Sequence, residues 1–484
     1  MEIMNETIEG ISKKLEAKEI SAVELTKLSL AKIDRTKDLN ILHEICEEKA
    51  LQSAKEIDEK RAKGATLPKL AGVPIVIKDN ISKVGTFTTC SSQFLANYKS
   101  PYNATVVDKL IENGAVIVGK ANMDEFAMGS STENCAFGAV HNPWNKDYVP
   151  GGSSGGSAAS VASDQCFASL GTDTGGSIRQ PSSFCGVVGL KPTYGLVSRF
   201  GVVAFASSLD QVGPITKSVR DSSIMLDAIA GHDDNEFTSA KHEKENYYAD
   251  SFTGSVKGLK IGIAKEFFES LTNTEVKESI EKAIDFFVAQ GAEKIEIDLP
   301  HIKDALAVYY VLSSAEAASN LARFDGIKYG VPTDEYKDLV DFYVQSRTKG
   351  FGKEVKRRIM LGNFVLSSGY FDAYYNKAKA VQNLIINEFE KAFSTCDIII
   401  SPTTPSPAFK IGEKVDNPLE MYLNDIYTVP VNIATLPAIS IPCGISKSGL
   451  PLGMQLISNR FNEKTLFNAG DCFEKNYFSI REVK

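Results

Sequence analysis

The sequence of 484 residues has few histidines, one tryptophan and no pair of closely spaced cysteines. Its eight cysteines lie far apart along the chain, without a C-x-x-C pair or a histidine at the spacing of metal ligands. This pattern does not support a zinc ribbon or a dense disulfide framework. We therefore expect buried free thiols and no metal site.

Long apolar runs are also missing. The longest uncharged stretch, 426–446, would be long enough to cross a bilayer, but three prolines interrupt it, so it does not form one continuous apolar helix. The first residues lack the basic and apolar regions of a secretory signal. The sequence therefore predicts a cytoplasmic protein with no membrane contact.

Positive charge is not in excess, because 53 Lys and Arg face 61 Asp and Glu, which gives a net charge of −8. A negative chain is repelled by nucleic-acid backbones, so we expect a partner to hold any nucleic acid that this protein needs. Hydrophobic residues make up 43% and charged residues 24%, as in soluble globular proteins with a sizeable core. The length corresponds to about three domains or one unusually large one.

The order of apolar and polar residues indicates an α/β protein that begins with a helical segment. Residues 1–64 have helical spacing, and Ser21 and Glu24 form an S-x-x-E capping box. From Gly72 onward, short apolar runs alternate with amphipathic helices. One such helix ends at Gly291 and is followed by a strand pattern over 295–299.

Two segments rich in glycine and serine, 151–157 (GGSSGGS) and 171–177 (GTDTGGS), flank a helix of small residues. Glycine allows unusual backbone angles and a close approach of ligands to backbone N–H groups. A flexible linker is the alternative, but two such stretches around one helix weaken it. Ser157 stands where a phosphate-binding loop needs lysine, no apolar strand precedes the G-x-S-x-G match, and G-x-G-x-x-G is absent.

A serine nucleophile in these segments would need a base, because a free hydroxyl attacks weakly at neutral pH. The five histidines lie in helical or polar contexts, which gives little support to a Ser-His-Asp triad. Lys78 ends the apolar run 72–77, and burial there would lower its pKa enough for it to accept a proton. The alternative is a lysine that reaches the surface beyond a core strand.

These segments resemble the amidase signature family: G-V-P-I-V-I-K-D-N around Lys78, then G-G-S-S-G-G-S, then G-T-D-T-G-G-S-I-R-Q-P over 171–181. They occur in the order in which the family has them. The resemblance implies a Ser-cisSer-Lys triad, in which Ser177 is the nucleophile, Ser153 the bridging hydroxyl and Lys78 the base.

The same resemblance implies an oxyanion hole and a fold. The backbone N–H groups of Thr174, Gly175 and Gly176, together with that of the nucleophile, would bind the developing oxyanion. The fold would be a single large mixed β-sheet surrounded by helices. We therefore expect an N-terminal helical segment over 1–64 and an amidase signature domain over 65–484.

The resemblance extends beyond the core motifs to 123–134, 319–326, 358–362 and 421–430. There the chain is similar to the glutamine-hydrolysing subunits of glutamyl-tRNA(Gln) amidotransferases. This implies that the chain releases ammonia from glutamine for a partner B-subunit, which uses ATP and Mg²⁺ to convert Glu-tRNA(Gln) to Gln-tRNA(Gln). It also implies a small C-subunit, which completes a heterotrimer, tRNA held mainly by the B-subunit, and no cofactor in this chain.

The resemblance also assigns the glutamine contacts. Arg358 would bind the α-carboxylate and Asp425 the α-ammonium, and charge-assisted pairs suit such a zwitterion. Tyr309 would line the pocket, although its neighbour Tyr310 is an alternative. Structural roles are also open, with Arg358 paired to an acid on its own helix and Asp425 capping a helix.

Two other functions are compatible with parts of this pattern. A stand-alone amidase acting on a small aryl or fatty amide would keep Lys78, Ser153 and Ser177 but would not need Arg358 and Asp425. A catalytically inactive scaffold that supports a tRNA-binding partner would be favoured by the loss of a triad residue, and all three are present.

Overall fold

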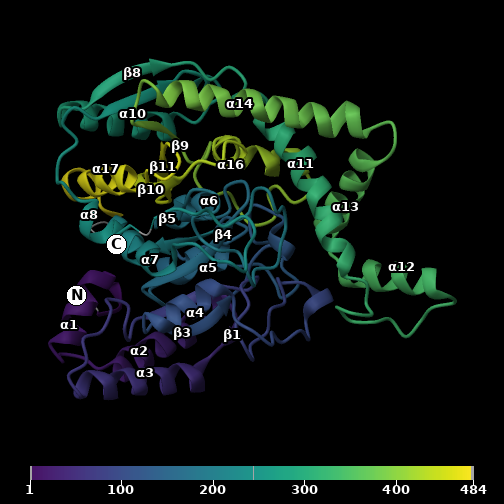
Figure 1. The fold of residues 1–484 in the computed structure, drawn as a ribbon, viewed down its shortest axis with the longest axis horizontal. Helices are drawn as coiled ribbons and strands as arrows, with labels where there is room; N and C mark the ends of the chain where they lie inside the picture. The colour runs from purple at the N-terminus through teal and green to yellow at the C-terminus, as the bar shows by residue number, and fades with distance from the viewer. Residues whose placement is uncertain (1–2, 244, 481–484) are drawn as a thin grey trace.

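The computed structural model describes residues 3–243 and 245–480, and these form an α/β fold around one mixed β-sheet (Figure 1). Within the described residues the sheet has eleven strands in the order β1-β3-β2-β4-β6-β5-β10-β11-β9-β7-β8. The predicted single large mixed sheet is therefore confirmed. The strands are β1 Leu42–Ile45, β2 Pro74–Lys78, β3 Val116–Ala121, β4 Ala168–Asp173, β5 Val188–Lys191, β6 Gln211–Thr216, β7 Lys260–Ala264, β8 Glu293–Ile297, β9 Ile398–Pro402, β10 Ala438–Ile445 and β11 Pro451–Ser458.

Helices surround this sheet. Figure 1 shows α1, α2 and α3 together at the N-terminal end of the molecule, while α12 and α13 extend away from its body. The helices are α1 Ile8–Glu16, α2 Ala22–Arg35, α3 Glu47–Ala62, α4 Thr105–Glu112, α5 Gly155–Ala162, α6 Arg179–Cys185, α7 Val219–Ile229, α8 Tyr247–Asp250, α9 Glu266–Glu269, α10 Thr274–Ala289, α11 Ala305–Asn320, α12 Leu339–Gly350, α13 Lys353–Leu366, α14 Lys377–Phe393, α15 Pro418–Tyr422, α16 Val429–Ile433 and α17 Glu463–Asn476.

The pairing of β2 with β4 sets the position of the candidate site. These two strands are parallel neighbours, with Ile77 opposite Leu170. Parallel neighbours end at the same edge of a sheet, so Lys78 at the end of β2 lies beside the last residues of β4. The segment 174–177, which directly follows β4, therefore begins at the edge where Lys78 stands.

The N-terminal segment contains the predicted capping box, in which the hydroxyl of Ser21 accepts from Glu24 N–H and the Glu24 carboxylate accepts from Ser21 N–H. It also contains a strand that the sequence analysis missed. Strand β1 pairs antiparallel with β3, with Leu42 opposite Ala121. The expectation of helices alone over 1–64 is therefore wrong at this point, because four residues of mixed polarity show no clear strand period.

The helix-to-strand unit predicted before residue 299 corresponds to α10 and β8. The strand begins at Glu293 and ends at Ile297, two residues earlier than expected. Leu299 follows the strand and is fully buried. Because β8 is the last strand of the sheet, the core also takes this residue beyond the ladder.

The part of the chain that the structure describes contains no helix of the length and hydrophobicity needed to cross a bilayer. No group of three or more metal-ligating side chains occurs in the same part. All eight cysteines are free thiols, and all except Cys135 are buried.

Candidate active site

Lys78 is fully buried at the end of β2, in contact with the hydroxyls of the first Gly/Ser segment. Its Nζ lies 2.8 Å from Ser153 Oγ, 2.8 Å from Ser154 Oγ and 2.9 Å from Thr172 Oγ1. Burial lowers the pKa of the Lys78 amine to about 7. At neutral pH a large share of the amine is therefore uncharged and can accept a proton from a hydroxyl.

Three buried carboxyl groups, those of Asp124, Asp173 and Asp210, oppose the effect of burial on Lys78. Asp124 is itself desolvated, and burial raises its pKa to about 7 even though it accepts a hydrogen bond from Thr132 N–H. Asp173 is paired with Arg179. Neither of these two groups therefore acts as a free anion that would hold Lys78 in its charged form.

The segment around Ser153 is tightly packed and has no room for larger residues. The peptide bond between Gly152 and Ser153 is cis, as the family resemblance implies. A Cβ on Gly152 would lie 2.0 Å from Asp124 Oδ2, so a larger residue does not fit. The segment is buried and continues directly into α5. The flexible-linker alternative is therefore wrong for these residues.

Ser177 lies in the turn between β4 and α6, next to the Ser153 segment. Its carbonyl accepts a hydrogen bond of 3.2 Å from Ser154 N–H, which joins the two segments. The Ser177 side chain is 8% exposed, and its hydroxyl has no hydrogen-bond partner among residues 3–243 and 245–480. The structure thus brings Lys78 and Ser153 into contact and places the Ser177 backbone beside them. The hydrogen bond from Ser177 to Ser153 stays a prediction.

The expected oxyanion hole differs from the observed arrangement at Gly176. Its N–H already donates to Asp173 Oδ1 at 2.8 Å, so it is not available to a substrate. The N–H groups of Gly175 and Ser177 have no acceptor within the described part of the chain. Thr174 contributes its hydroxyl to Asp210 at 2.7 Å. The two free amides of Gly175 and Ser177 are therefore the available donors.

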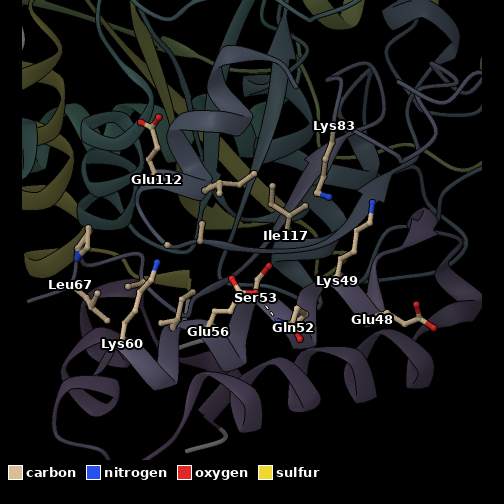
Figure 2. Close-up of a pocket in the computed structure, with 16 residues that line it drawn as sticks. Glu48, Lys49, Gln52, Ser53, Glu56, Lys60, Leu67, Lys83, Glu112 and Ile117 are labelled. Atoms are coloured by element: carbon tan, nitrogen blue, oxygen red, sulfur yellow. Dashed lines mark hydrogen bonds between the residues drawn. The ribbon is translucent and has the colours of Figure 1, made fainter. Parts of the chain in front are cut away.

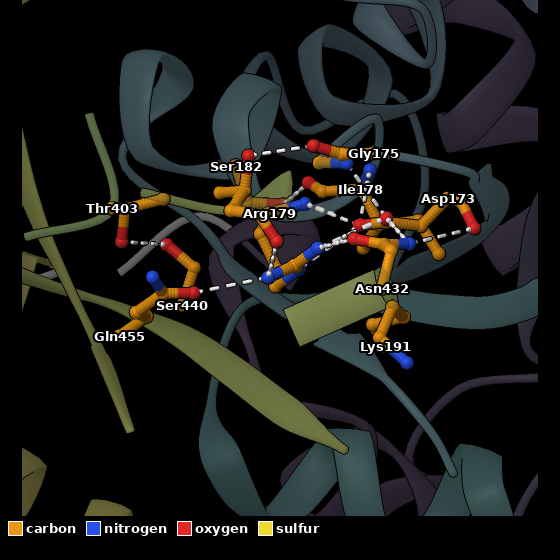
Figure 3. Close-up of polar contacts among 12 residues, drawn as sticks. Asp173, Gly175, Ile178, Arg179, Ser182, Lys191, Thr403, Asn432, Ser440 and Gln455 are labelled. Carbon is orange, nitrogen blue, oxygen red and sulfur yellow. Dashed lines mark hydrogen bonds and ion pairs between the residues drawn. The ribbon is translucent and has the colours of Figure 1, made fainter. Parts of the chain in front are cut away.

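A buried ion pair holds the Ser177 turn in place (Figure 3). Arg179 Nε lies 3.1 Å from Asp173 Oδ2, and both side chains are fully buried. Burial by itself would raise the pKa of Asp173, but the Arg179 guanidinium lowers it to about 2. Because Asp173 also accepts from the N–H groups of Gly176 and Ile178, the ion pair fixes the backbone on both sides of Ser177.

Sequence reasoning missed this ion pair and the neighbours of Lys78. Arg179 also bonds the side chains of Asn432 and Gln455, which are more than 250 residues away. Asp173 and Arg179 both stand in the motif 171–181, which was a signal of their importance. The contacts of Ser154 and Thr172 with Lys78 depend on the register of β2 against β4, which the sequence does not show.

Tyr309 on α11 faces the nucleophile turn. A Cβ on Gly175 would lie 2.7 Å from the Tyr309 ring, so glycine makes room for this side chain. Tyr310 instead lies on Arg358, whose guanidinium is 4.4 Å from the centre of its ring. The structure therefore places Tyr309, rather than Tyr310, next to the Ser177 turn.

Arg358 on α13 is buried, and one of its nitrogens lacks a partner. Its Nε donates to Glu354 Oε1 at 2.7 Å, so the predicted alternative of an acid on the same helix is present. Its Nη1 is buried without a hydrogen bond to any described residue. A buried, unpaired guanidinium nitrogen is costly, and an anion placed beside it would remove that cost.

Asp425 supplies a carboxyl group to the same region. Ser130 Oγ donates to Asp425 Oδ2 at 2.5 Å, and burial raises the pKa of Asp425 to about 7. Its carboxyl group does not cap a helix, unlike the predicted alternative. The charges of Arg358 and Asp425 both act on the Tyr309 hydroxyl, so the three side chains surround one region.

A cavity of about 200 Å³ lies beside these residues and is lined by Gly129, Ser131, Glu354 and Tyr422. Glu354 and Tyr422 are also direct neighbours of the Arg358 guanidinium. A small polar molecule can therefore be placed close to the cationic group. None of the nine predicted site residues lines this cavity itself.

Comparisons with known proteins give one consistent result. The profile of the family described as Amidase matches residues 24–467. The chain is 57% identical, over 99% of its length and 97% of the relative, to the A-subunit of glutamyl-tRNA(Gln) amidotransferase from Caldanaerobacter subterraneus subsp. tengcongensis. It is 56% identical, over 99% of its length and 98% of the relative, to the protein of the same name from Thermoanaerobacter pseudethanolicus.

Solved structures show the same fold. The crystal structure of the glutamyl-tRNA(Gln) amidotransferase A-subunit from Thermotoga maritima matches with a TM-score of 0.81 and 43% identity, covering 98% of this chain and 96% of that one. A peptide amidase from Stenotrophomonas maltophilia matches with a TM-score of 0.83 and 26% identity, covering 97% and 96%. The fold is thus similar both to amidases and to an amidotransferase component.

Proposed function

Because the chain belongs to the amidase family, we propose that it hydrolyses glutamine as the A-subunit of a glutamyl-tRNA(Gln) amidotransferase. The observation that carries this proposal is the buried amine of Lys78, 2.8 Å from the Ser153 hydroxyl and beside the turn that holds Ser177. A desolvated lysine against a serine hydroxyl is the arrangement needed to activate a hydroxyl nucleophile.

The reaction begins with a proton relay. Uncharged Lys78 accepts the proton of Ser153, which accepts the proton of Ser177 as Ser177 Oγ forms a bond to the side-chain amide carbon of glutamine. The relay returns a proton to the amide nitrogen as the carbon–nitrogen bond breaks and ammonia leaves. Water, deprotonated by the same relay, then cleaves the acyl-enzyme ester and releases glutamate.

The free backbone amides of the nucleophile turn stabilise the tetrahedral intermediate. The N–H groups of Gly175 and Ser177 have no other acceptor among the described residues, and the Asp173–Arg179 pair fixes the turn that carries them. Donors held in place before the reaction cost no reorganisation when the oxyanion forms.

Glutamine is recognised by its two charged α-groups. The unpaired Nη1 of Arg358 binds the α-carboxylate, and ionised Asp425 binds the α-ammonium. Tyr309, which lies against Gly175, separates this recognition region from the reacting carbon. An aryl or fatty amide offers neither charged group, so these contacts would not select it.

The ammonia is used on a partner. The names of the relatives support a heterotrimeric assembly in which the B-subunit uses ATP and Mg²⁺ to activate Glu-tRNA(Gln) and the C-subunit joins the other two chains. The net charge of −8 supports tRNA being held mainly by the B-subunit.

The test is ammonia release from L-glutamine and from a simple aryl amide, with and without the co-expressed B- and C-subunits. We expect glutamine turnover that rises with the partners and falls in Arg358→Ala through a higher KM. Lys356→Ala, on the same helix but outside the pocket, is the matched control. Efficient aryl amide turnover that is indifferent to Arg358 would make the chain a stand-alone amidase.

A further inference from the structure

A second cavity, of about 530 Å³, lies far from Ser177, between helix α3 and the first strands of the sheet (Figure 2). Its walls come from α3, the end of α4, the start of β3, the loop 67–71 and Lys83. Its volume lies within the range of about 300–1,000 Å³ that is usual for small-molecule sites. No predicted site residue lines it.

Lys83 is the unusual group in this cavity. Its side chain is only 8% exposed, yet its amine has no hydrogen bond or ion pair with any residue that the structure describes. Burial lowers the pKa of Lys83, and the nearby ammonium groups of Lys49 and Lys120 lower it further. A buried ammonium without a partner is costly to the fold unless an anion joins it.

Lys49 on α3 points to the same end of the cavity as Lys83, and Figure 2 shows their amines directed toward one another. The Lys49 amine has a single long hydrogen bond of 3.4 Å, to the carbonyl of Val84. Lys120 differs, because it bonds the carbonyl of Ile81 at 2.5 Å and lies 3.7 Å from Asp79. Lys49 and Lys83 therefore form a pair of cations that is open to an anion.

The rest of the cavity is apolar on one side and acidic on the other. Ile57, Leu67 and Ile117 line it with aliphatic side chains. Glu56 and Glu112 also line it and would repel a second anionic group on the same ligand. The lining therefore suits a molecule with one anionic end and an apolar body.

We propose that this cavity binds a small organic monoanion, whose carboxylate or phosphate group is held between Lys83 and Lys49 and whose apolar body lies on Ile57 and Ile117. This site is independent of the glutaminase function proposed above. Occupation would neutralise the buried cation and join α3 to the sheet, so the ligand stabilises the folded chain.

The direct test is calorimetric titration of the full chain with 4-phenylbutyrate, with the uncharged 4-phenylbutanol and with inorganic phosphate. We expect phenylbutyrate to bind at least about tenfold more tightly than phenylbutanol, because a charge-assisted contact contributes this much. Displacement of phenylbutyrate by phosphate would show that the site also accepts the phosphate form. Equal affinity for phenylbutyrate and phenylbutanol would overturn the proposal.

Variants locate the site. Lys83→Met should weaken phenylbutyrate binding at least about tenfold while raising the melting temperature of the unliganded chain, since it removes an unpaired buried charge. Lys60→Met, in the same cavity away from the Lys83 end, is the control and should change affinity less than about threefold. Lys49→Met provides a second test of the anion contact. Unchanged affinity in both Lys83→Met and Lys49→Met would contradict the assignment.

Discussion

Lys78 can act as a base because its amine is buried among hydroxyls and not against a free carboxylate. Ser153, Ser154 and Thr172 supply those hydroxyls, each within 3 Å of the amine. Hydroxyls accept hydrogen bonds from a lysine without adding the negative charge that would keep it protonated. The low pKa of Lys78 is thus a property of its surroundings.

The first prediction concerns pH. Because the Lys78 pKa is about 7 and the uncharged amine is the active form, glutaminase kcat/KM should rise as pH increases through about 7. Asp425, whose pKa is also about 7, must be ionised to bind the α-ammonium and acts in the same direction. A pH profile of ammonia release measures this rise. A flat profile between about pH 6 and pH 8 would contradict it.

The second prediction separates two neighbouring serines. Both hydroxyls lie 2.8 Å from Lys78, but Ser154 Oγ also donates to the carbonyl of Thr172. Ser153→Ala should reduce kcat about 10²–10⁴-fold, since it breaks the relay. Ser154→Ala should cost about tenfold or less, because this residue positions Lys78 without transferring the proton. Equal losses in the two variants would show that the relay is assigned to the wrong serine or shared.

Single residues were predictable where a motif marks them. The position of Lys78 at the end of an apolar run indicated burial, and the structure shows it fully buried. The hydrogen bond from Gly176 N–H to Asp173 was not predictable, because it depends on the turn conformation at a glycine with φ of +138°. The unpaired Nη1 of Arg358 likewise depends on packing between α11 and α13.

At the scale of elements, the turn after β4 is held by a buried ion pair between its two ends. The third prediction is that Asp173→Asn lowers the free energy of unfolding by about 3–5 kcal/mol, since it leaves Arg179 charged and unpaired in the core. Chemical denaturation measures this loss. Asp34→Asn, which removes an exposed ion pair with Lys37, is the control and should change stability by about 0.5 kcal/mol or less.

The same ion pair has a pH consequence. The pKa of Asp173 is about 2, below its ordinary value of 3.8, so the folded state favours the ionised form. The resulting stabilisation is complete above about pH 4 and is lost as pH falls through about 2. The stability difference between the wild-type chain and Asp173→Asn should therefore shrink on acidification.

The fourth prediction concerns the Ser153 segment. Gly152→Ala would place a Cβ 2.0 Å from Asp124 Oδ2 and 2.7 Å from Ser131 N, so the segment must move. We expect a loss of glutaminase activity of at least about 10²-fold, since a displacement of about 1 Å is enough for that. Gly254→Ala, where no atom lies within 4 Å, is the control and should keep its activity. Normal activity in Gly152→Ala would mean that this segment does not position a catalytic group.

Elements were predictable in proportion to how apolar they are. The apolar runs at Val73, Val116 and Ile398 correspond to β2, β3 and β9. Strand β6 was missed because glutamine, glycine, proline and threonine are among its six residues, although all six are buried. Its place in the sheet comes from pairing with β4 and β5, which a local pattern does not reveal.

For the whole molecule, one sheet brings together residues from distant parts of the chain. Arg179 bonds Asn432, and Ser130 bonds Asp425, so the site is complete only when the fold is complete. The family motifs made the sheet and the triad predictable, whereas the composition alone left the number of domains open.

The fifth prediction concerns assembly. Ser177→Ala should reduce glutamine hydrolysis by at least about 10³-fold and leave co-purification with the B- and C-subunits unchanged. The reason is that the lost hydroxyl makes no hydrogen bond among the described residues and adds little packing. Size-exclusion chromatography of the co-expressed chains measures the second part. A variant that is inactive and also fails to assemble would show a structural role for Ser177.

The most direct test of the nucleophile is covalent labelling with a diazoketone analogue of glutamine, followed by peptide mass spectrometry. We expect one adduct, on Ser177, which is lost in Ser177→Ala and is blocked by excess L-glutamine. The eight free cysteines provide an internal alternative, since they are stronger intrinsic nucleophiles. A glutamine-protected adduct on a cysteine, or on a serine other than Ser177, would contradict the assignment.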